Sequence, residues 1–184
     1  MGRPLNSFAE LSAAWREGTD YRRCWRRRNS SLLVVAPHGG RLEAGTDRIA
    51  VAMAGGRHSL YLFQACRPHG NPDLHLASDR FDDPLCLELA ATHDWVLTVH
   101  GCGGGGEVVY LGGRDLVLKE RLAAACRGVG LETVTEGHPW PGRRRLNICN
   151  RGRRGMGVQV ELTRALRLGE RRRILVQALQ EALP

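Results

Sequence analysis

Short apolar runs alternate with amphipathic segments along most of the chain. Apolar runs of four to eight residues bounded by turn residues are typical of buried strands, and a period of three to four residues is typical of helices. Because the two patterns alternate, the sequence predicts an α/β fold, a single open mixed sheet with helices on both faces. The expected strands are 31–37, 60–63, 74–76, 95–99, 108–111, 146–150 and 157–162.

Capping and stop signals mark the expected helices. Ser7 and Glu10 have the spacing of a capping box, and the helix that they open is expected to run to about Arg16. Thr46 is expected to cap the next helix, and Gly128 to end a later one. The remaining helical segments are 46–53, 85–92, 115–127 and 171–183.

Length and composition are those of one globular domain, which we expect to span residues 1–184 as a monomer. Hydrophobic residues make up 42% of the chain and charged residues 25%, which argues against disorder. No run approaches the ~20 apolar residues of a membrane span. The first residues contain no apolar signal segment, so a cytoplasmic protein is expected, although release of a phage protein by lysis would leave no such mark.

The six cysteines contain no CxxC pair, so the sequence does not indicate a cysteine zinc site. Several lie in apolar runs and are expected to be reduced and buried. The net charge of +8 comes from arginine, apart from Lys119, and favours a polyanionic partner without identifying it. Two arginine-rich segments with neighbouring aromatic residues, 21–28 and 140–145, could bind nucleic acid, although such runs are more often solvated.

The candidate chemistry lies where two apolar strands end in His-Gly, at His38 and His100. Ligands of open α/β sheets collect at the carboxyl ends of strands, so both histidines could face one crevice. Glu43 follows His38 after a glycine turn and can fold back toward the same point. Two histidines and one glutamate are the ligands of a catalytic zinc ion whose fourth position stays open. The sequence therefore predicts a Zn²⁺ site.

A zinc amidase also needs a carboxylate that is not a ligand and that moves protons. Glu161, between apolar residues of the last expected strand, is the candidate, and an ion pair with Arg164 is the alternative. His75 is either a substrate-binding residue or a core histidine. A further set could bind a substrate carboxylate or an oxyanion, or could simply fix a turn: Asn147, Asn150 and Arg151.

At these residues the chain resembles the phage and bacterial poly-γ-glutamate hydrolases, a zinc-peptidase family with a carboxypeptidase-like sheet. The resemblance covers nearly the whole chain and rests on these segments: SFAEL (7–11), PHGGRLEAGT (37–46), LHLASDRFDDP (74–84), VHGC (99–102), VYLGGRD (109–115), NICNR (147–151) and GVQVEL (157–162). It implies that His38, Glu43 and His100 bind zinc and that Glu161 is the general base. It also implies cleavage of the γ-glutamyl amide bonds of poly-γ-glutamate, a polyanion that suits the basic chain. The glycine run 103–106 departs from the family pattern and leaves the substrate contacts of that loop open.

Other interpretations remain. The string GxGxxG at 101–106 follows a strand, but strand-like residues rather than a helix come next, which argues against a dinucleotide site. Cys102 could act as a nucleophile beside His100, but this would leave Glu43 and Glu161 unexplained. An amidase of another acyl-glutamate and a non-catalytic protein that binds nucleic acid are the rival functions, and the zinc motif makes nucleic acid the less expected partner.

Overall fold

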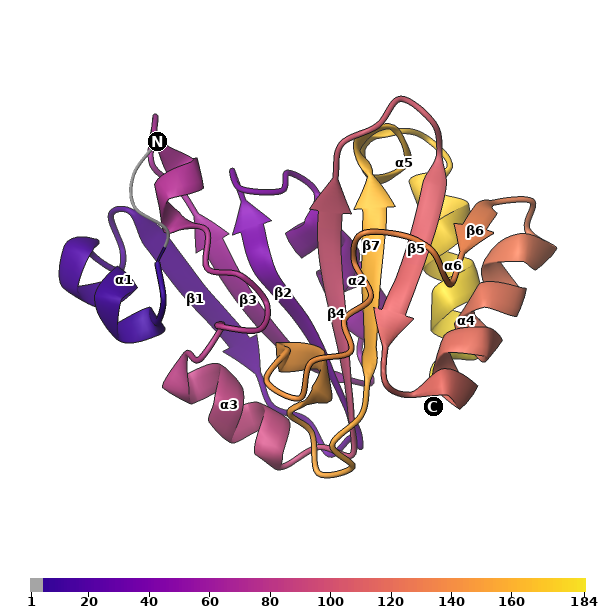
Figure 1. The fold of residues 1–184 in the computed structure, drawn as a ribbon, viewed down its shortest axis with the longest axis horizontal. Helices are drawn as coiled ribbons and strands as arrows, with labels where there is room; N and C mark the ends of the chain where they lie inside the picture. The colour runs from indigo at the N-terminus through magenta and orange to yellow at the C-terminus, as the bar shows by residue number, and fades with distance from the viewer. Residues whose placement is uncertain (1–4) are drawn as a thin grey trace.

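A seven-stranded mixed sheet forms the centre of the protein, for which a computed structural model describes residues 5–184 (Figure 1). The strand order is β1-β3-β2-β4-β7-β5-β6. The pairs β2–β3, β2–β4, β4–β7 and β5–β6 are parallel, whereas β1–β3 and β5–β7 are antiparallel. The strands are β1 (Tyr21–Arg26), β2 (Leu32–Gly40), β3 (Ser59–Ala65), β4 (Trp95–Cys102), β5 (Val108–Gly113), β6 (Glu132–Val134) and β7 (Val158–Thr163).

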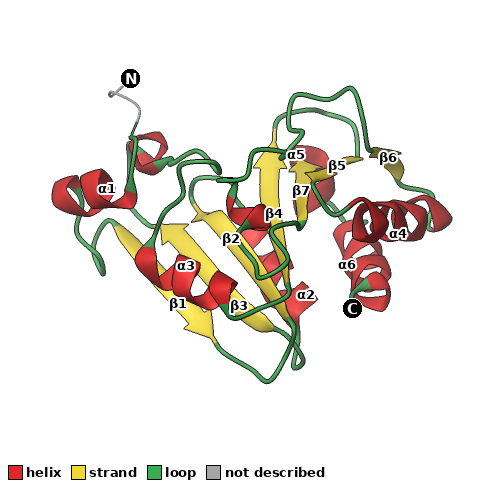
Figure 2. Ribbon diagram, turned by 60° about the horizontal axis from the view of Figure 1, so that its bottom comes forward, coloured by secondary structure: helices red, strands yellow, loops and turns green. Residues whose placement is uncertain are grey.

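Helices cover both faces of the sheet, as the alternating pattern predicted (Figure 2). The apolar residues of α2, α4 and α6 pack on one face, and those of α1 and α3 pack on the other. None of the helices described within 5–184 is long and apolar enough to cross a membrane. The helices are α1 (Phe8–Ala14), α2 (Thr46–Ala54), α3 (Pro84–Ala91), α4 (Leu116–Gly128), α5 (Arg164–Leu168) and α6 (Arg172–Ala182), with two 3-10 helices, η1 (Asn71–Leu74) and η2 (Ile148–Asn150).

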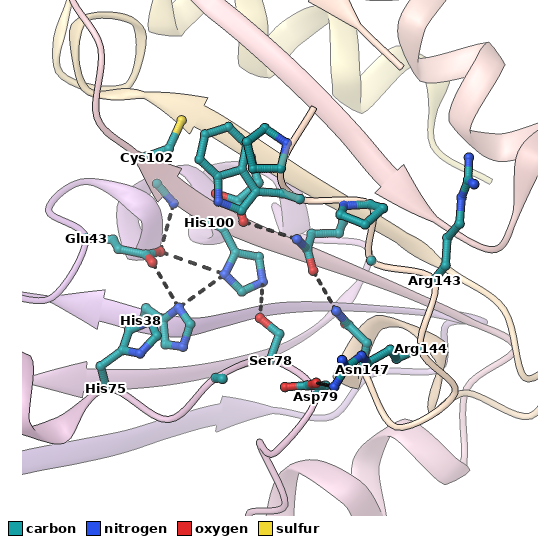
Figure 3. A pocket seen from close by; sticks show the side chains of 18 of the residues that line it. His38, Glu43, His75, Ser78, Asp79, His100, Cys102, Arg143, Arg144 and Asn147 are labelled. Atoms are coloured by element: carbon teal, nitrogen blue, oxygen red, sulfur yellow. Dashed lines mark hydrogen bonds and ion pairs between the residues drawn. The ribbon is translucent and has the colours of Figure 1, made fainter. Parts of the chain in front are cut away.

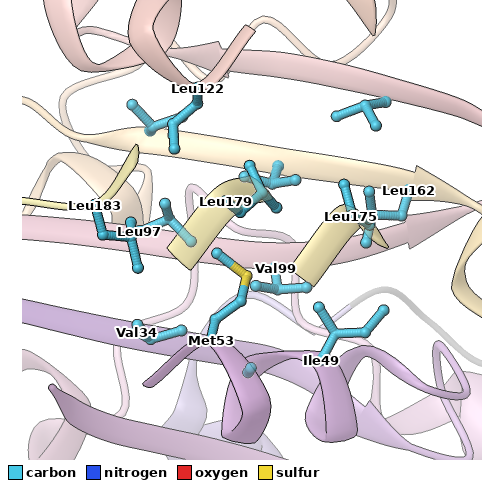
Figure 4. Packing of buried hydrophobic residues seen from close by; sticks show 14 of the residues in the cluster. Val34, Ile49, Met53, Leu97, Val99, Leu122, Leu162, Leu175, Leu179 and Leu183 are labelled. Carbon is cyan, nitrogen blue, oxygen red and sulfur yellow. The ribbon is translucent and has the colours of Figure 1, made fainter. Parts of the chain in front are cut away.

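The larger core lies between the sheet and α2, α4 and α6 (Figure 4). Leu97 and Val99 of β4 and Leu162 of β7 are fully buried there against Leu175 and Leu179 of α6. A fully buried leucine or valine contributes about 1.5–3 kcal/mol relative to its exposed state. The apolar residues of β4 and β7 on this face leave the alternate residues of the same strands, His100 and Glu161, on the opposite face.

Several local predictions are wrong. Residues 74–76 and 146–150 are not strands: η1 ends at Leu74, and residues 148–150 form η2. The N-cap of α2 is Gly45 in the left-handed region (φ 95°) rather than Thr46, whose hydroxyl donates to the carbonyl of Glu43. Ser7 does cap α1, but Glu10 accepts its hydrogen bond from the backbone N–H of Asn6. The edge strands β1 and β6 and the short helix α5 were not predicted.

Candidate active site

A cleft of about 600 Å³ opens beside the carboxyl ends of β2, β4 and β7 (Figure 3). His38 on β2 and His100 on β4 lie at its base, and Glu43 reaches it from the loop that follows β2. Because β2 and β4 are parallel neighbours, their ends bring the two histidines together although 62 positions separate them in the sequence. Both imidazoles are buried, with exposed fractions of 2% and 1%.

The three side chains point their ligand atoms at one another. Nδ1 of His38 lies 3.2 Å from Nδ1 of His100 and 3.0 Å from Oε1 of Glu43, and Oε2 of Glu43 lies 3.8 Å from Nδ1 of His100. Nε2 of His38 lies 2.8 Å from the carbonyl oxygen of Leu76, which can only accept, so this nitrogen carries the proton. Nδ1 of His38 is thus left to bind a cation, the tautomer that metal-binding histidines adopt.

The remaining contacts of Glu43 and His100 support this geometry. The backbone N–H of Gly101 donates to Oε2 of Glu43 at 2.8 Å, and Ser78 Oγ lies 3.4 Å from Nε2 of His100. Two nitrogens bound to one tetrahedral zinc ion at about 2.0–2.1 Å would be about 3.4 Å apart. The observed 3.2 Å between the two Nδ1 atoms and the mixed N, N, O donor set therefore fit zinc.

Electrostatics keep the cluster in a state suited to cation binding. Burial alone would raise the pKa of Glu43, but the neighbouring His38 and His100 lower it to about 2. Burial lowers the pKa of His100 to about 3, so its ring is neutral at pH 7. Burial also disfavours a proton on His38, but the Glu43 carboxylate outweighs this effect and raises the pKa of His38. The cluster thus offers an ionised carboxylate and a neutral imidazole.

His75 lies beside this cluster in the loop after η1. Its ring stacks on His38 with the centroids 4.2 Å apart, and its ligand atom forms a second candidate set with those of His38 and Glu43, all within 4.8 Å of one another. His75 is exposed and lines the cleft, so the alternative of a core histidine is wrong. Although His75 is exposed at one side, its ring is partly desolvated where it packs on His38, and this desolvation together with the charge of His38 lowers its pKa to about 4.

Glu161 faces the cleft from β7. It is the registered partner of His100 on β4, and registered partners in neighbouring strands lie on the same face of the sheet. The side chain is 5% exposed, and burial together with the charge of Glu43 raises its pKa to about 8. Arg164, the alternative ion-pair partner, makes no such pair with Glu161 in the described structure.

A chain of side-chain amides holds Glu161. Nε2 of Gln159 donates to Oε1 of Glu161 at 3.1 Å, and Nδ2 of Asn147 donates to Oε1 of Gln159 at 2.8 Å. Oδ1 of Asn147 accepts from the backbone N–H of Cys149, which fixes the orientation of the whole chain. Gln159 and Glu161 are two residues apart on one strand, so both side chains point into the cleft.

Comparison with known proteins identifies the family. The family model described as poly-gamma-glutamate hydrolase matches residues 5–177. The chain belongs to this family. It is 31% identical over 151 residues to the UPF0714 protein YndL of Bacillus subtilis (strain 168), an alignment that covers 81% of this chain and 60% of YndL. The chain spans 48–60% of the length of the curated relatives that it matches.

Solved structures of this family share the fold. The structure of a bacteriophage poly-gamma-glutamate hydrolase superposes with a TM-score of 0.92 at 25% identity, covering 97% of this chain and 95% of the other. A zinc-free structure of YndL superposes with a TM-score of 0.90 at 27% identity, covering 97% and 96%. The predicted hydrolase-type α/β fold and the predicted family are therefore confirmed.

The structure brings together most of the residues that the sequence suggested for the site. His38, Glu43, His75, His100, Asn147 and Glu161 line the cleft, whereas Asn150 and Arg151 do not. The amide nitrogen of Asn150 is buried and donates to the carbonyls of Gly142 and Arg144, so this side chain fixes the loop beside the cleft. Cys102 lines the cleft, but burial and the charge of Glu161 raise its pKa to about 11, which disfavours a thiolate nucleophile.

Four polar groups near the site were not predicted: Ser78, Asp79, Gln159 and Arg167. Gln159 could have been found from its spacing, because it alternates with Glu161 in the strand GVQVEL. Arg167 of α5 had no signal, since nothing in the sequence separates it from the other arginines. Its guanidinium donates to the carbonyls of Ala44 and Cys102, and so joins the Glu43 loop to the end of β4.

Proposed function

We propose that this chain is a zinc-dependent amidase of one domain that cleaves the γ-glutamyl amide bonds of poly-γ-glutamate. The convergence of two Nδ1 atoms and one carboxylate within 3.0–3.8 Å at the base of the cleft is the observation that carries this proposal. The family supports the polymer as substrate. One structure of YndL is described as its zinc-free form, which supports zinc as the metal of that relative. We extend the assignment of zinc to this chain.

His38, Glu43 and His100 would hold the ion, since His100 is buried and directly opposite His38, whereas His75 is exposed at the edge of the cleft. Bound zinc supplies a Lewis acid that polarises the scissile carbonyl and acidifies water. The positive charge of a bound ion would lower the pKa of Glu161 from about 8 and ionise its carboxyl, which would then take the proton of the attacking water and deliver it to the leaving nitrogen. Gln159 and Asn147 hold the Glu161 carboxylate on the cleft side of β7 while this proton moves.

His75 and Asn147 then contact the substrate. Asn147 lines the cleft between Ser78 and the loop 139–144, where its amide can also reach a bound peptide group. His75 remains neutral at pH 7 and so donates or accepts a hydrogen bond without adding charge.

Polymer size after incubation with the zinc-loaded protein tests the proposal. We expect shortening of high-molecular-weight poly-γ-glutamate that a strong chelator abolishes and added zinc restores. Glu161→Gln should retain zinc while losing about 10²–10⁴-fold in rate, the contribution of a positioned proton-transfer group. Intact polymer in the presence of one equivalent of zinc would refute the substrate, and full activity of Glu161→Gln would refute the mechanism.

A further inference from the structure

One wall of the cleft is a basic loop that the chemistry above leaves unused. Residues 139–144 line the cleft; Arg144 lies beside Asp79 and Asn147, and the side chain of Arg143 points away from His38 and Glu43 (Figure 3). Both side chains are largely exposed, at 60% and 83%. Arginine at the edge of a deep cleft presents a planar fork of donors that matches a carboxylate.

The backbone of this loop is fixed. The carbonyl of Pro141 accepts from the N–H of Gly113 on β5, and Gly142 packs against the same glycine with a φ of 59°. Asn150 donates to the carbonyls of Gly142 and Arg144. Arg143 is therefore held in place by its backbone and adapts only through its side chain, which suits a binding residue.

The charges around the two arginines differ. Arg144 pairs with Asp79 at 2.7 Å, and Asp79 also lines the cleft, so this pair is neutral. Arg143 contacts Glu136, but Glu136 is also bound by the buried ammonium of Lys119 at 2.7 Å. The three-membered cluster Lys119–Glu136–Arg143 thus keeps one net positive charge, and Glu136 retains a partner if Arg143 turns away.

We propose that Arg143 binds a free α-carboxylate of the γ-linked substrate by exchanging Glu136 for it, while Arg144 neutralises Asp79 so that the anionic chain can enter the cleft. This inference rests on the proposed function. In a γ-linked glutamate chain the α-carboxylate of every residue is free, so a residue next to the scissile bond along the cleft presents one to this wall. Arg143 is a specificity residue, separate from the groups that carry out the chemistry.

Arg143→Gln tests the proposal, with Arg22→Gln as the matched control that removes the same charge from an exposed position outside the cleft. Binding of tri-γ-glutamate and of the same trimer with its α-carboxylates converted to amides is measured by calorimetry in the zinc-loaded Glu161→Gln protein. Hydrolysis of the polymer is measured with Glu161 intact. Arg143→Lys, which keeps the charge and loses the fork, should be intermediate.

We expect Arg143→Gln to weaken trimer binding and to raise the KM for polymer by about three- to fivefold, the upper part of the range of an exposed ion pair, with unchanged kcat and zinc content. Arg22→Gln should change neither, and binding of the amide trimer should not respond to Arg143. The proposal would be overturned if Arg143→Gln and Arg22→Gln weakened trimer binding equally, or if Arg143→Gln weakened binding of the amide trimer as much as that of the acid trimer. It would also be overturned if an oligonucleotide of the same charge bound more tightly than the trimer and that binding depended on Arg143. Arg143-dependent trimer binding by a protein that cleaves nothing would support this subsite while refuting the proposed function.

Discussion

Gly101 and Arg167 pack so closely that a Cβ atom added to Gly101 would lie 2.7 Å from both Cζ and Nε of Arg167. The same guanidinium bonds the carbonyls of Ala44, Cys102 and Leu162, at 2.9, 2.6 and 3.1 Å. Arg167 therefore ties the three segments that present Glu43, His100 and Glu161. The glycine is required for this packing rather than for a special backbone conformation, since its φ is not in the left-handed region.

Gly101→Ala should therefore lower the free energy of unfolding by about 1–3 kcal/mol, as overpacking of a tight site does. Gly103→Ala is the matched control, because a Cβ there meets no atom within 4 Å. Urea denaturation of both variants measures the difference. In an Arg167→Ala background the cost of Gly101→Ala should shrink, and a cost that stays the same in that background would show that the two residues are not coupled.

The two candidate ligand sets, with His100 or with His75 beside His38 and Glu43, predict different effects of mutation on zinc affinity. His100→Ala should reduce zinc affinity by more than the roughly 10–100-fold that is lost when a residue only supports a ligand. His75→Ala should leave the affinity near that of the wild type. Competition with a chromophoric chelator measures the zinc affinity of both variants. The rise in Tm on adding zinc should rank the variants in the same order, because a ligand that binds only the folded protein stabilises it more when it binds more tightly. Loss of zinc in His75→Ala alone would instead make His75 the third ligand.

The amide chain that holds Glu161 can be broken without adding charge. Gln159→Met keeps a similar volume but removes the donor to Glu161 and the acceptor for Asn147. We expect kcat to fall by about tenfold through misplacement of the carboxylate, with zinc content and KM nearly unchanged. Gln177→Met is the control, because it removes a comparable bond to Glu181 on the exposed face of α6. An unchanged kcat in Gln159→Met would show that Glu161 is positioned by other contacts.

A buried histidine far from the cleft should make stability depend on pH. His93 is 2% exposed and bonds the carbonyl of Leu89 and the hydroxyl of Ser59, and burial lowers its pKa below the usual 6.5. The unfolded chain therefore binds a proton that the folded chain does not, and stability declines as the pH falls below about 6.5. His93→Gln should be less stable at pH 7 but lose less stability between pH 7 and 5. His69→Gln, at an exposed position, is the control, and identical pH slopes in all three proteins would contradict the expectation.

The sequence predicted β2 and β4 well because each is buried on both faces and reads as an apolar run, whereas β7 alternates apolar residues with Gln159 and Glu161. It predicted the helices α1, α2, α3, α4 and α6 to within two residues at each end. It failed at β1, whose Arg22 and Trp25 are exposed at the sheet edge, since an edge strand needs no apolar run. It also failed at 146–150, where apolar residues fill a 3-10 turn.

For the site, the strand ends located His38 and His100, because a parallel sheet places the carboxyl ends of its strands at one edge. Sequence alone could not separate Asn147, which faces the cleft, from Asn150, which faces its own loop. That distinction depends on how η2 turns. Nor could it single out Arg143 or Arg167 from the other arginines, because their contacts depend on the fold: a loop brings Arg143 to Glu136, and Arg167 reaches Ala44 from 123 positions away.

The position of β7 has a consequence for synthesis of the chain. This strand pairs with β4 on one side and β5 on the other, yet within residues 5–184 it is the last strand in chain order. Until residue 163 is available, the nascent protein consists of a four-stranded sheet ending at β4 and a separate β5–β6 pair, each with an unpaired inner edge open to aggregation. Glu161 arrives with the strand that joins the two parts, so an incomplete chain holds His38 and His100 but neither a closed sheet nor the Glu161 carboxylate.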